Sequence, residues 1–208
     1  MNIINAYPTP IGTFEIENCE SLNKGLTEFI YNIKAVEKGS NYQHSMAGPQ
    51  GFHTKEDLLS YDNPFIIEFH QKISEKIIEY YSTITEDPMG PNTKMASWGM
   101  IYGQGDYSTP HTHPLADIST VYYCKVPEGL LEEWEKSKPG AFHYIDPRPA
   151  SRWDRNFATN SVESIPAKEG TGAIHPGWLE HYVTPHYLKD DRISIATNVF
   201  IDHGTFFK

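Results

Sequence analysis

The chain has 208 residues, enough for one domain with a sizeable core, and its 38% hydrophobic and 13% aromatic content excludes a disordered chain. Its formal net charge of −10 disfavours binding to nucleic acid, because a phosphate backbone is usually bound by clusters of Lys and Arg. No apolar run approaches the roughly 20 residues that span a bilayer, and the N-terminus lacks the pattern of a signal peptide, so we expect a cytoplasmic protein with no membrane partner.

The first part of the chain predicts an extended start and two amphipathic helices. Residues 7–14 are strand-like, and residues 21–36 place Leu22, Leu26, Phe29, Ile30 and Ile33 at helical intervals. A second helix begins after Asn63, with Pro64 at its first position, and is expected to end near residues 87–90. Its apolar stripe consists of Phe65, Ile66, Phe69, Ile73, Ile77 and Tyr80 or Tyr81.

From Met95 to Phe200 the pattern changes to short strand-like runs separated by Gly and Pro. Residues 134–166 are polar and interrupted by prolines, which predicts a long excursion between strands and not a separate domain. We therefore expect a single domain over residues 1–208. Residues 1–94 would form an N-terminal strand and helical support, and residues 95–202 would form a β-rich core with the 134–166 insertion.

Two histidines in this β-rich part, His111 and His113, are separated by one residue. Side chains alternate faces along a strand, so on a strand both imidazoles would point to one side and could bind one metal ion. His181, expected to open a later strand, can supply a third imidazole. A lone histidine is more often a surface or hydrogen-bonded core residue than a ligand, but two on one strand face are costly to place without a shared partner.

Arg192 and Ser194 follow His181 and share one face of a predicted strand. A guanidinium fork and a hydroxyl on that face can hold a carboxylate, because Arg binds both carboxylate oxygens in a planar pair. The alternative is that Arg192 pairs with Asp190 or Asp191 at the surface.

With HxH, a distant His and RxS at these spacings, the chain resembles the Fe(II)- and 2-oxoglutarate-dependent oxygenases. Residues 102–125 are similar to the prolyl hydroxylase branch. A group of small, partly phage-associated oxygenases shares the HxHP, VYY, Asp146-Pro-Arg148 and RISIAxN motifs. The resemblance implies a mainly β protein with N-terminal helices (α+β) and a double-stranded β-helix, or jelly-roll, core.

The resemblance also implies the cofactors and the residues that bind them. Fe(II) would be bound by His111, His113 and His181. The cosubstrate 2-oxoglutarate would be held by Arg192, Ser194, Tyr123 and Tyr102, and Arg192 would join the three histidines as a catalytic residue. The family's acidic ligand is replaced by His113, so two histidines and a carboxylate become three histidines, unless Asp117 turns toward the metal.

The implied activity is hydroxylation of an unknown substrate, with a peptidyl residue suggested, coupled to decarboxylation of 2-oxoglutarate to succinate. Two alternatives stay open. A cupin-like three-histidine metalloenzyme without 2-oxoglutarate is favoured by Gly105, the HxH pair and Asp117, which nearly reproduce the first cupin motif. A non-catalytic binding protein on the same fold would bind metal weakly. A symmetric homodimer is the default expectation for the oligomeric state.

Overall fold

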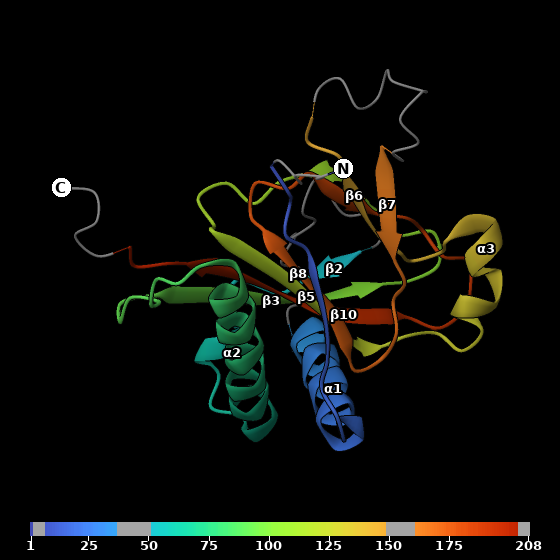
Figure 1. Cartoon of the computed structure of the whole chain (residues 1–208). Helices are drawn as coiled ribbons and strands as arrows, with labels where there is room; N and C mark the ends of the chain where they lie inside the picture. The colour runs from blue at the N-terminus through green and yellow to red at the C-terminus, as the bar shows by residue number, and fades with distance from the viewer. Residues whose placement is uncertain (2–6, 37–50, 149–160, 204–208) are drawn as a thin grey trace.

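The computed structural model describes residues 1, 7–36, 51–148 and 161–203, and two antiparallel sheets form its centre (Figure 1). The strand orders are β1-β8-β5-β10-β3-β2 in the six-stranded sheet and β4-β9-β6-β7 in the four-stranded sheet. The larger sheet consists of β1 (Gly12–Glu15), β2 (Phe52–His53), β3 (Lys94–Tyr102), β5 (Ile118–Lys125), β8 (Thr171–Pro176) and β10 (Arg192–Phe200). The smaller sheet consists of β4 (Ser108–His111), β6 (Phe142–Ile145), β7 (Val162–Ile165) and β9 (His181–Val183). The expectation of a mainly β chain with N-terminal helices is confirmed.

Helices α1 (Glu20–Val36) and α2 (Pro64–Ile84) lie side by side against one face of the larger sheet (Figure 1). Both predicted helices are confirmed. Asn63 caps α2, because its side-chain oxygen accepts from the backbone N–H of Phe65 at 2.9 Å and of Ile66 at 3.4 Å. The helix ends earlier than expected, because Thr85 is already extended. Short helices complete the described chain: η1 (Leu58–Ser60), η2 (Leu130–Glu133) and α3 (Trp134–Ser137).

Strand β10 pairs with β3 on one side and β5 on the other, and its two faces have different roles. Ile193, Ile195 and Val199 are fully buried in the main core with α1 and α2. Arg192, Ala196 and Asn198, at the alternate positions of the strand, line a cavity between the two sheets. The apolar face therefore fixes the strand, and the other face is available for a site.

The expectation that residues 134–166 form an excursion is wrong for much of the described segment. It contains α3, β6 and β7, and β6 pairs with both β7 and β9, so two strands of the smaller sheet come from it. Each of these strands has only four residues, too few to produce a recognisable alternation. Residues 149–160 lie outside the described residues.

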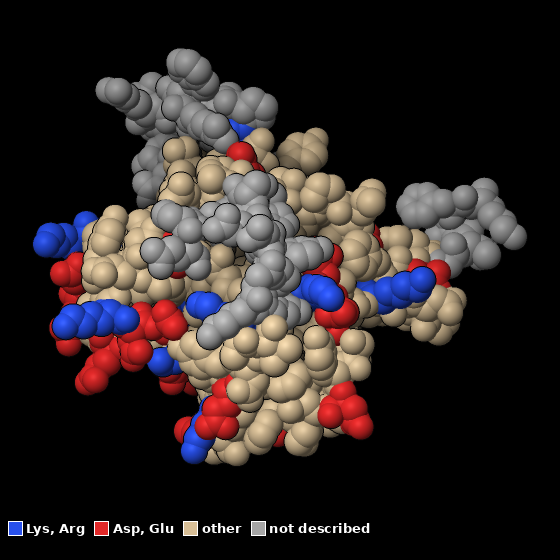
Figure 2. Space-filling model, turned by 180° about the vertical axis from the view of Figure 1, so that it is seen from behind, with Lys and Arg blue, Asp and Glu red and all other residues tan. Residues whose placement is uncertain are grey.

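Among the described residues, every helix is too short or too polar to cross a membrane. On the face in Figure 2, Lys and Arg are scattered among Asp and Glu, so that face has no extended basic patch.

Candidate metal and cosubstrate site

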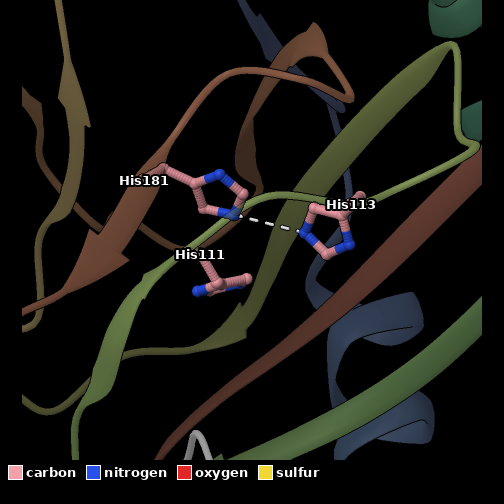
Figure 3. Close-up of side chains that lie close together, drawn as sticks. All are labelled: His111, His113 and His181. Carbon is pink, nitrogen blue, oxygen red and sulfur yellow. Dashed lines mark hydrogen bonds between the residues drawn. The ribbon is translucent and has the colours of Figure 1, made fainter.

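The three predicted histidines meet at one point between the sheets (Figure 3). His111 ends β4, His181 begins β9, and the two residues pair directly. His113 lies two residues past the end of β4, so the expectation that both members of the HxH pair occupy one strand is wrong for His113. Its loop is held by the turn after β8: the N–H of His113 donates to the carbonyl of Gly177 at 2.9 Å, and the N–H of Gly177 donates to the carbonyl of Asp117 at 3.0 Å.

The spacing of the imidazoles suits a single metal ion. One nitrogen from each ring lies within 4.8 Å of the others, and the Nε2 atoms of His113 and His181 are 3.2 Å apart. Two ligand nitrogens at about 2.1 Å from one ion and at right angles would be about 3 Å apart. The three side chains therefore fit a divalent metal.

Backbone carbonyls orient two of these rings. The Nδ1 of His181 donates to the carbonyl of Leu179 at 2.8 Å, and the Nδ1 of His111 donates to the carbonyl of Thr109 at 2.7 Å. Because a carbonyl only accepts, each Nδ1 carries the proton and each Nε2 keeps a lone pair for a metal. Burial, with a smaller contribution from neighbouring imidazoles, lowers the pKa of His181 to about 2. His181 is therefore neutral, the form that binds metals.

Asp117 is engaged away from the three histidines. Its Oδ2 accepts from the backbone N–H of Ile201 at 2.7 Å, and its Oδ1 lies 2.9 Å from the Nε2 of His203. Among the described residues, the three histidines are the one group of three or more possible metal ligands that meets at a point. The site as described therefore offers three imidazoles and no carboxylate.

The four residues expected to hold 2-oxoglutarate also come together, and we call them the carboxylate clamp: Arg192, Ser194, Tyr102 and Tyr123. The sheet register assembles them, because Arg192 pairs with Tyr102 on β3 and Ser194 pairs with Tyr123 on β5. The guanidinium carbon of Arg192 lies 4.9 Å from the ring centroid of Tyr123 and 5.6 Å from that of Tyr102. Arg192 is only 1% exposed, so its charge is removed from bulk water.

Four buried polar atoms of the clamp have no hydrogen-bond partner within the described protein. Arg192 Nε and Nη1, Ser194 Oγ and the Tyr123 hydroxyl are all buried without a hydrogen bond to another described residue. An uncompensated buried charge costs several kcal/mol, so such a group is expected to meet an anion. Burial raises the pKa of Tyr123, against the opposing effect of Arg192, so its hydroxyl stays protonated and can donate. These atoms fit a carboxylate.

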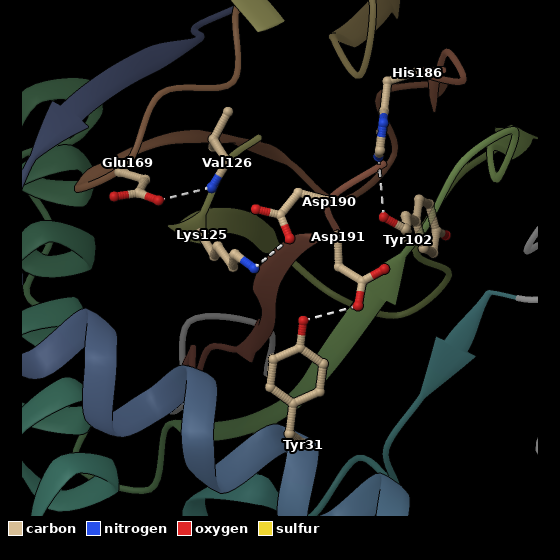
Figure 4. A network of polar contacts seen from close by, with 8 residues as sticks. All are labelled: Tyr31, Tyr102, Lys125, Val126, Glu169, His186, Asp190 and Asp191. Atoms are coloured by element: carbon tan, nitrogen blue, oxygen red, sulfur yellow. Dashed lines mark hydrogen bonds and ion pairs between the residues drawn. The ribbon is translucent and has the colours of Figure 1, made fainter. Parts of the chain in front are cut away.

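The alternative that Arg192 pairs with its acidic neighbours at the surface does not hold, because Arg192 is buried and both carboxylates are engaged elsewhere (Figure 4). Asp190 forms an ion pair with Lys125 at 2.9 Å, and Asp191 accepts a hydrogen bond from the hydroxyl of Tyr31 on α1 at 2.8 Å. Both carboxylates are therefore held outside the clamp, and the guanidinium remains available on the inner side.

The three histidines and two residues of the clamp line one cavity of about 360 Å³ between the two sheets. These residues are His111, His113, His181, Tyr102 and Arg192. A small molecule that binds a metal at one end and the guanidinium at the other can therefore occupy this one cavity.

Among the polar side chains of this cavity that were not predicted to have a role are His175 and Asn198. The imidazole of His175 is 1% exposed and lies 4.7 Å, centroid to centroid, from that of His181. Asn198 is the last residue of the RISIAxN motif, whose Arg and Ser belong to the clamp. Asn198 lies an even number of residues after Arg192 on the same predicted strand. Because side chains alternate faces along a strand, both side chains could have been expected to point to the same side.

Comparison with known proteins identifies the fold and the family. A prolyl-4-hydroxylase from Pseudomonas putida has a TM-score of 0.64 at 12% identity, and the match covers 94% of each chain. A prolyl hydroxylase from Trichoplax adhaerens, solved with a peptide fragment of hypoxia inducible factor, has a TM-score of 0.63 at 13% identity and covers 91% of this chain and 83% of that one. A viral collagen prolyl hydroxylase from Paramecium Bursaria Chlorella virus-1, solved with 2-oxoglutarate, has a TM-score of 0.55 at 14% identity, covering 91% and 94%.

The two sheets thus form the double-stranded β-helix of the non-haem oxygenases, as the sequence resemblance implied. Residues 96–198 match the family described as "Putative 2OG-Fe(II) oxygenase". The chain is an oxygenase whose cofactors are Fe(II) and 2-oxoglutarate. No curated protein matches the sequence.

Proposed function

We propose that the protein is a hydroxylase that binds Fe(II) through His111, His113 and His181 and holds 2-oxoglutarate through the carboxylate clamp. The main support is the buried guanidinium of Arg192, which lacks a hydrogen-bond partner at two of its nitrogens and opens into the same cavity as the three imidazoles. Neither a cupin-like enzyme without 2-oxoglutarate nor a non-catalytic shell requires a buried cation at that position.

Each residue of the proposed site has a defined task. The three imidazoles would hold the metal. A site without a carboxylate ligand has one negative charge fewer, which would favour an anionic chelating cosubstrate. Arg192 would bind both oxygens of the distal carboxylate, and the hydroxyls of Ser194 and Tyr123 would donate to the same group. When bound, the metal and 2-oxoglutarate supply oxygen activation, with decarboxylation to succinate and hydroxylation of a nearby C–H bond.

We propose a peptidyl residue as the substrate. Support comes from the names of the three similar structures, all prolyl hydroxylases, one of them solved with a bound peptide. At 12 to 14% identity these structures establish the fold alone, so the substrate depends on experiment. A single domain over residues 1–208 and a homodimer are also predictions.

The decisive test is anaerobic titration of Fe(II)-loaded protein with 2-oxoglutarate, observed through the visible charge-transfer band that chelation produces. The wild type should develop the band at about one equivalent. His181→Ala should lose metal binding. Arg192→Ala should keep the metal and bind 2-oxoglutarate at least about 100-fold more weakly, because two charge-assisted hydrogen bonds of about 1.5 to 3 kcal/mol each are lost.

Arg148→Ala is the matched control, since Arg148 is an exposed arginine that pairs with Asp146 outside the cavity. It should titrate like the wild type. Bound iron without a band in the wild type would favour the cupin-like enzyme, and absence of stoichiometric iron would favour the non-catalytic protein. If Arg192→Ala bound 2-oxoglutarate as tightly as the control, the clamp would be wrong.

A further inference from the structure

The inner face of the larger sheet contains a second group of polar residues that the carboxylate clamp does not include. Direct cross-strand pairs connect His175 on β8 to Ser119 on β5, and Ser119 to Asn198 on β10. These three side chains, which we call the polar row, are 1%, 1% and 9% exposed, and all three line the cavity. The polar row therefore faces the same enclosed space as the metal ligands.

The polar row and the clamp lie at different ends of that space. They are separated on the sheet by apolar residues that also pair directly across strands: Ala173, Val121, Ala196 and Trp98. Asn198 is four residues beyond Ser194, or about 13 Å along the strand. The five-carbon chain of 2-oxoglutarate, with C–C bonds of about 1.5 Å, is far shorter. A cosubstrate held by the clamp therefore does not reach Asn198.

The polar row is close to the metal ligands. The ring centroids of His175 and His181 are 4.7 Å apart. Trp98, one of the apolar residues between the clamp and the polar row, has its ring centroid 5.7 Å from that of His113. A molecule bound at the polar row would thus lie beside the metal, on the side away from Arg192. The prime substrate of an oxygenase must occupy such a position.

Asn198 has an unmet hydrogen-bonding requirement. Its Oδ1 is buried and has no hydrogen-bond partner among the described residues. The next residue back, Thr197, shows the usual arrangement: it is fully buried on the opposite face, and its Oγ1 lies 2.7 Å from Ser97 Oγ. A buried amide without a partner lowers stability, so a group that is kept in this state is a candidate for binding a ligand.

We propose that Asn198 determines specificity by binding a neutral amide of the prime substrate, with the hydroxyl of Ser119 beside it. An amide side chain offers one acceptor and a donor group, and another amide offers the complementary pair in the same plane. The polar row contains no Lys, Arg, Asp or Glu, so a charged group bound there would lose its hydration without gaining a counter-charge. This inference rests on the proposed function only in calling the bound molecule the substrate.

The test compares N-methylacetamide with its ester analogue methyl acetate, which lacks the N–H. Binding is measured by saturation-transfer NMR on Zn(II)-loaded protein with and without 2-oxoglutarate. Wild-type protein should bind the amide at least threefold more tightly than the ester. Asn198→Leu should reduce the affinity for the amide to that for the ester, and Thr197→Val should leave the preference unchanged.

Thermal unfolding separates binding from a structural role. Asn198→Leu removes an unpartnered polar group and should raise Tm by about 2 to 4 °C, whereas Thr197→Val removes a partner of Ser97 and should lower it. If Asn198→Leu does not fold, Asn198→Ala tests the amide preference, because it removes the side-chain amide without adding volume. Equal affinity of the wild type for amide and ester, or an unchanged preference in the Asn198 variant, would overturn the inference. Failure of the wild type to bind 2-oxoglutarate would instead overturn the proposed function, and the amide comparison without 2-oxoglutarate would still decide the role of Asn198.

Discussion

Replacing Gly177 with alanine should weaken metal binding, although Gly177 is not a ligand. Gly177 lies in the turn between β8 and β9, against the loop that contains His113. A Cβ atom on Gly177 would lie 2.1 Å from the carbonyl oxygen of Ala116, where ordinary contact begins at 3.4 Å. The obstructing atom belongs to the backbone and not to a flexible side chain, so the turn and the loop must separate by roughly 1 Å.

That separation would act on the metal site through two hydrogen bonds. The N–H of His113 donates to the carbonyl of Gly177, and the N–H of Gly177 donates to the carbonyl of Asp117. Metal sites need their ligands within about 0.5 Å of the correct position, and loss of supporting contacts typically lowers metal affinity about 10- to 100-fold. We expect a decrease of that size, equivalent to about 1.4 to 2.8 kcal/mol.

The measurement is competition between the protein and a chelating dye for Zn(II) or Fe(II), with circular dichroism to establish that the variant is folded. Gly129→Ala is the control: Gly129 has a φ of +80°, and its Cβ would make only ordinary contacts. Alanine there should cost about 1 kcal/mol of stability through backbone strain and leave metal affinity unchanged. A folded Gly177→Ala protein with wild-type metal affinity would refute the role of this turn in positioning His113.

Three further predictions concern stability. Gly25→Ala should lower the free energy of unfolding in urea by several kcal/mol, because the added Cβ would lie 2.3 Å from the ring of Phe65 between α1 and α2. A decrease in the free energy of unfolding below 1 kcal/mol would contradict this packing. Asn63→Ala should cost about 1 kcal/mol by removing the cap of α2, seen as a lower Tm, and Asn63→Asp should retain most of the stability. Burial lowers the pKa of His175 to about 4 and that of His181 to about 2. Between those values and about pH 6.5, both imidazoles are protonated in the unfolded chain but neutral in the folded protein. Metal-free protein should therefore lose stability as the pH falls below 6.5, by up to about 1.4 kcal/mol per pH unit for each residue, and His175→Phe should reduce the slope of urea stability against pH.

The sequence predicts the long elements well because they repeat one pattern many times. Helix α2 has its cap and its apolar stripe within consecutive residues, so local chemistry defines its start. Strand β2 has two residues and β6 and β7 have four each, and their pairing partners are far away in the chain. Their formation depends on the sheet that receives them, which no local pattern contains.

The site residues that lie on a single strand could be predicted from the sequence. The positions of residues where several distant segments meet could not. Arg192 and Ser194 follow from the alternation along β10, and their partners Tyr102 and Tyr123 followed from the family resemblance. The position of His113 beyond the end of β4 depends on hydrogen bonds to a turn more than sixty residues later, and the engagement of Asp117 depends on Ile201 and His203. The unpartnered Oδ1 of Asn198 is likewise a property of the assembled cavity, so its role required the structure.

Strand β10 links the stability of the protein to the geometry of its site. Ile193, Ile195 and Val199 are fully buried against the helices on one face of the strand. Arg192, Ser194 and Asn198, on the other face, belong to the clamp and the polar row. A shift of the pairing register of β10 by one residue would point the isoleucines into the cavity and Arg192 into the apolar core. Exposing the apolar side chains and burying the charge among apolar residues would both strongly destabilise the fold. The register that places Arg192 opposite Tyr102 and Ser194 opposite Tyr123 is therefore enforced by the helical core and not by the site itself. This explains how the clamp can keep a buried cation without an ion-pair partner among the described residues: the free energy that holds it in place comes from apolar burial on the other side of the same strand.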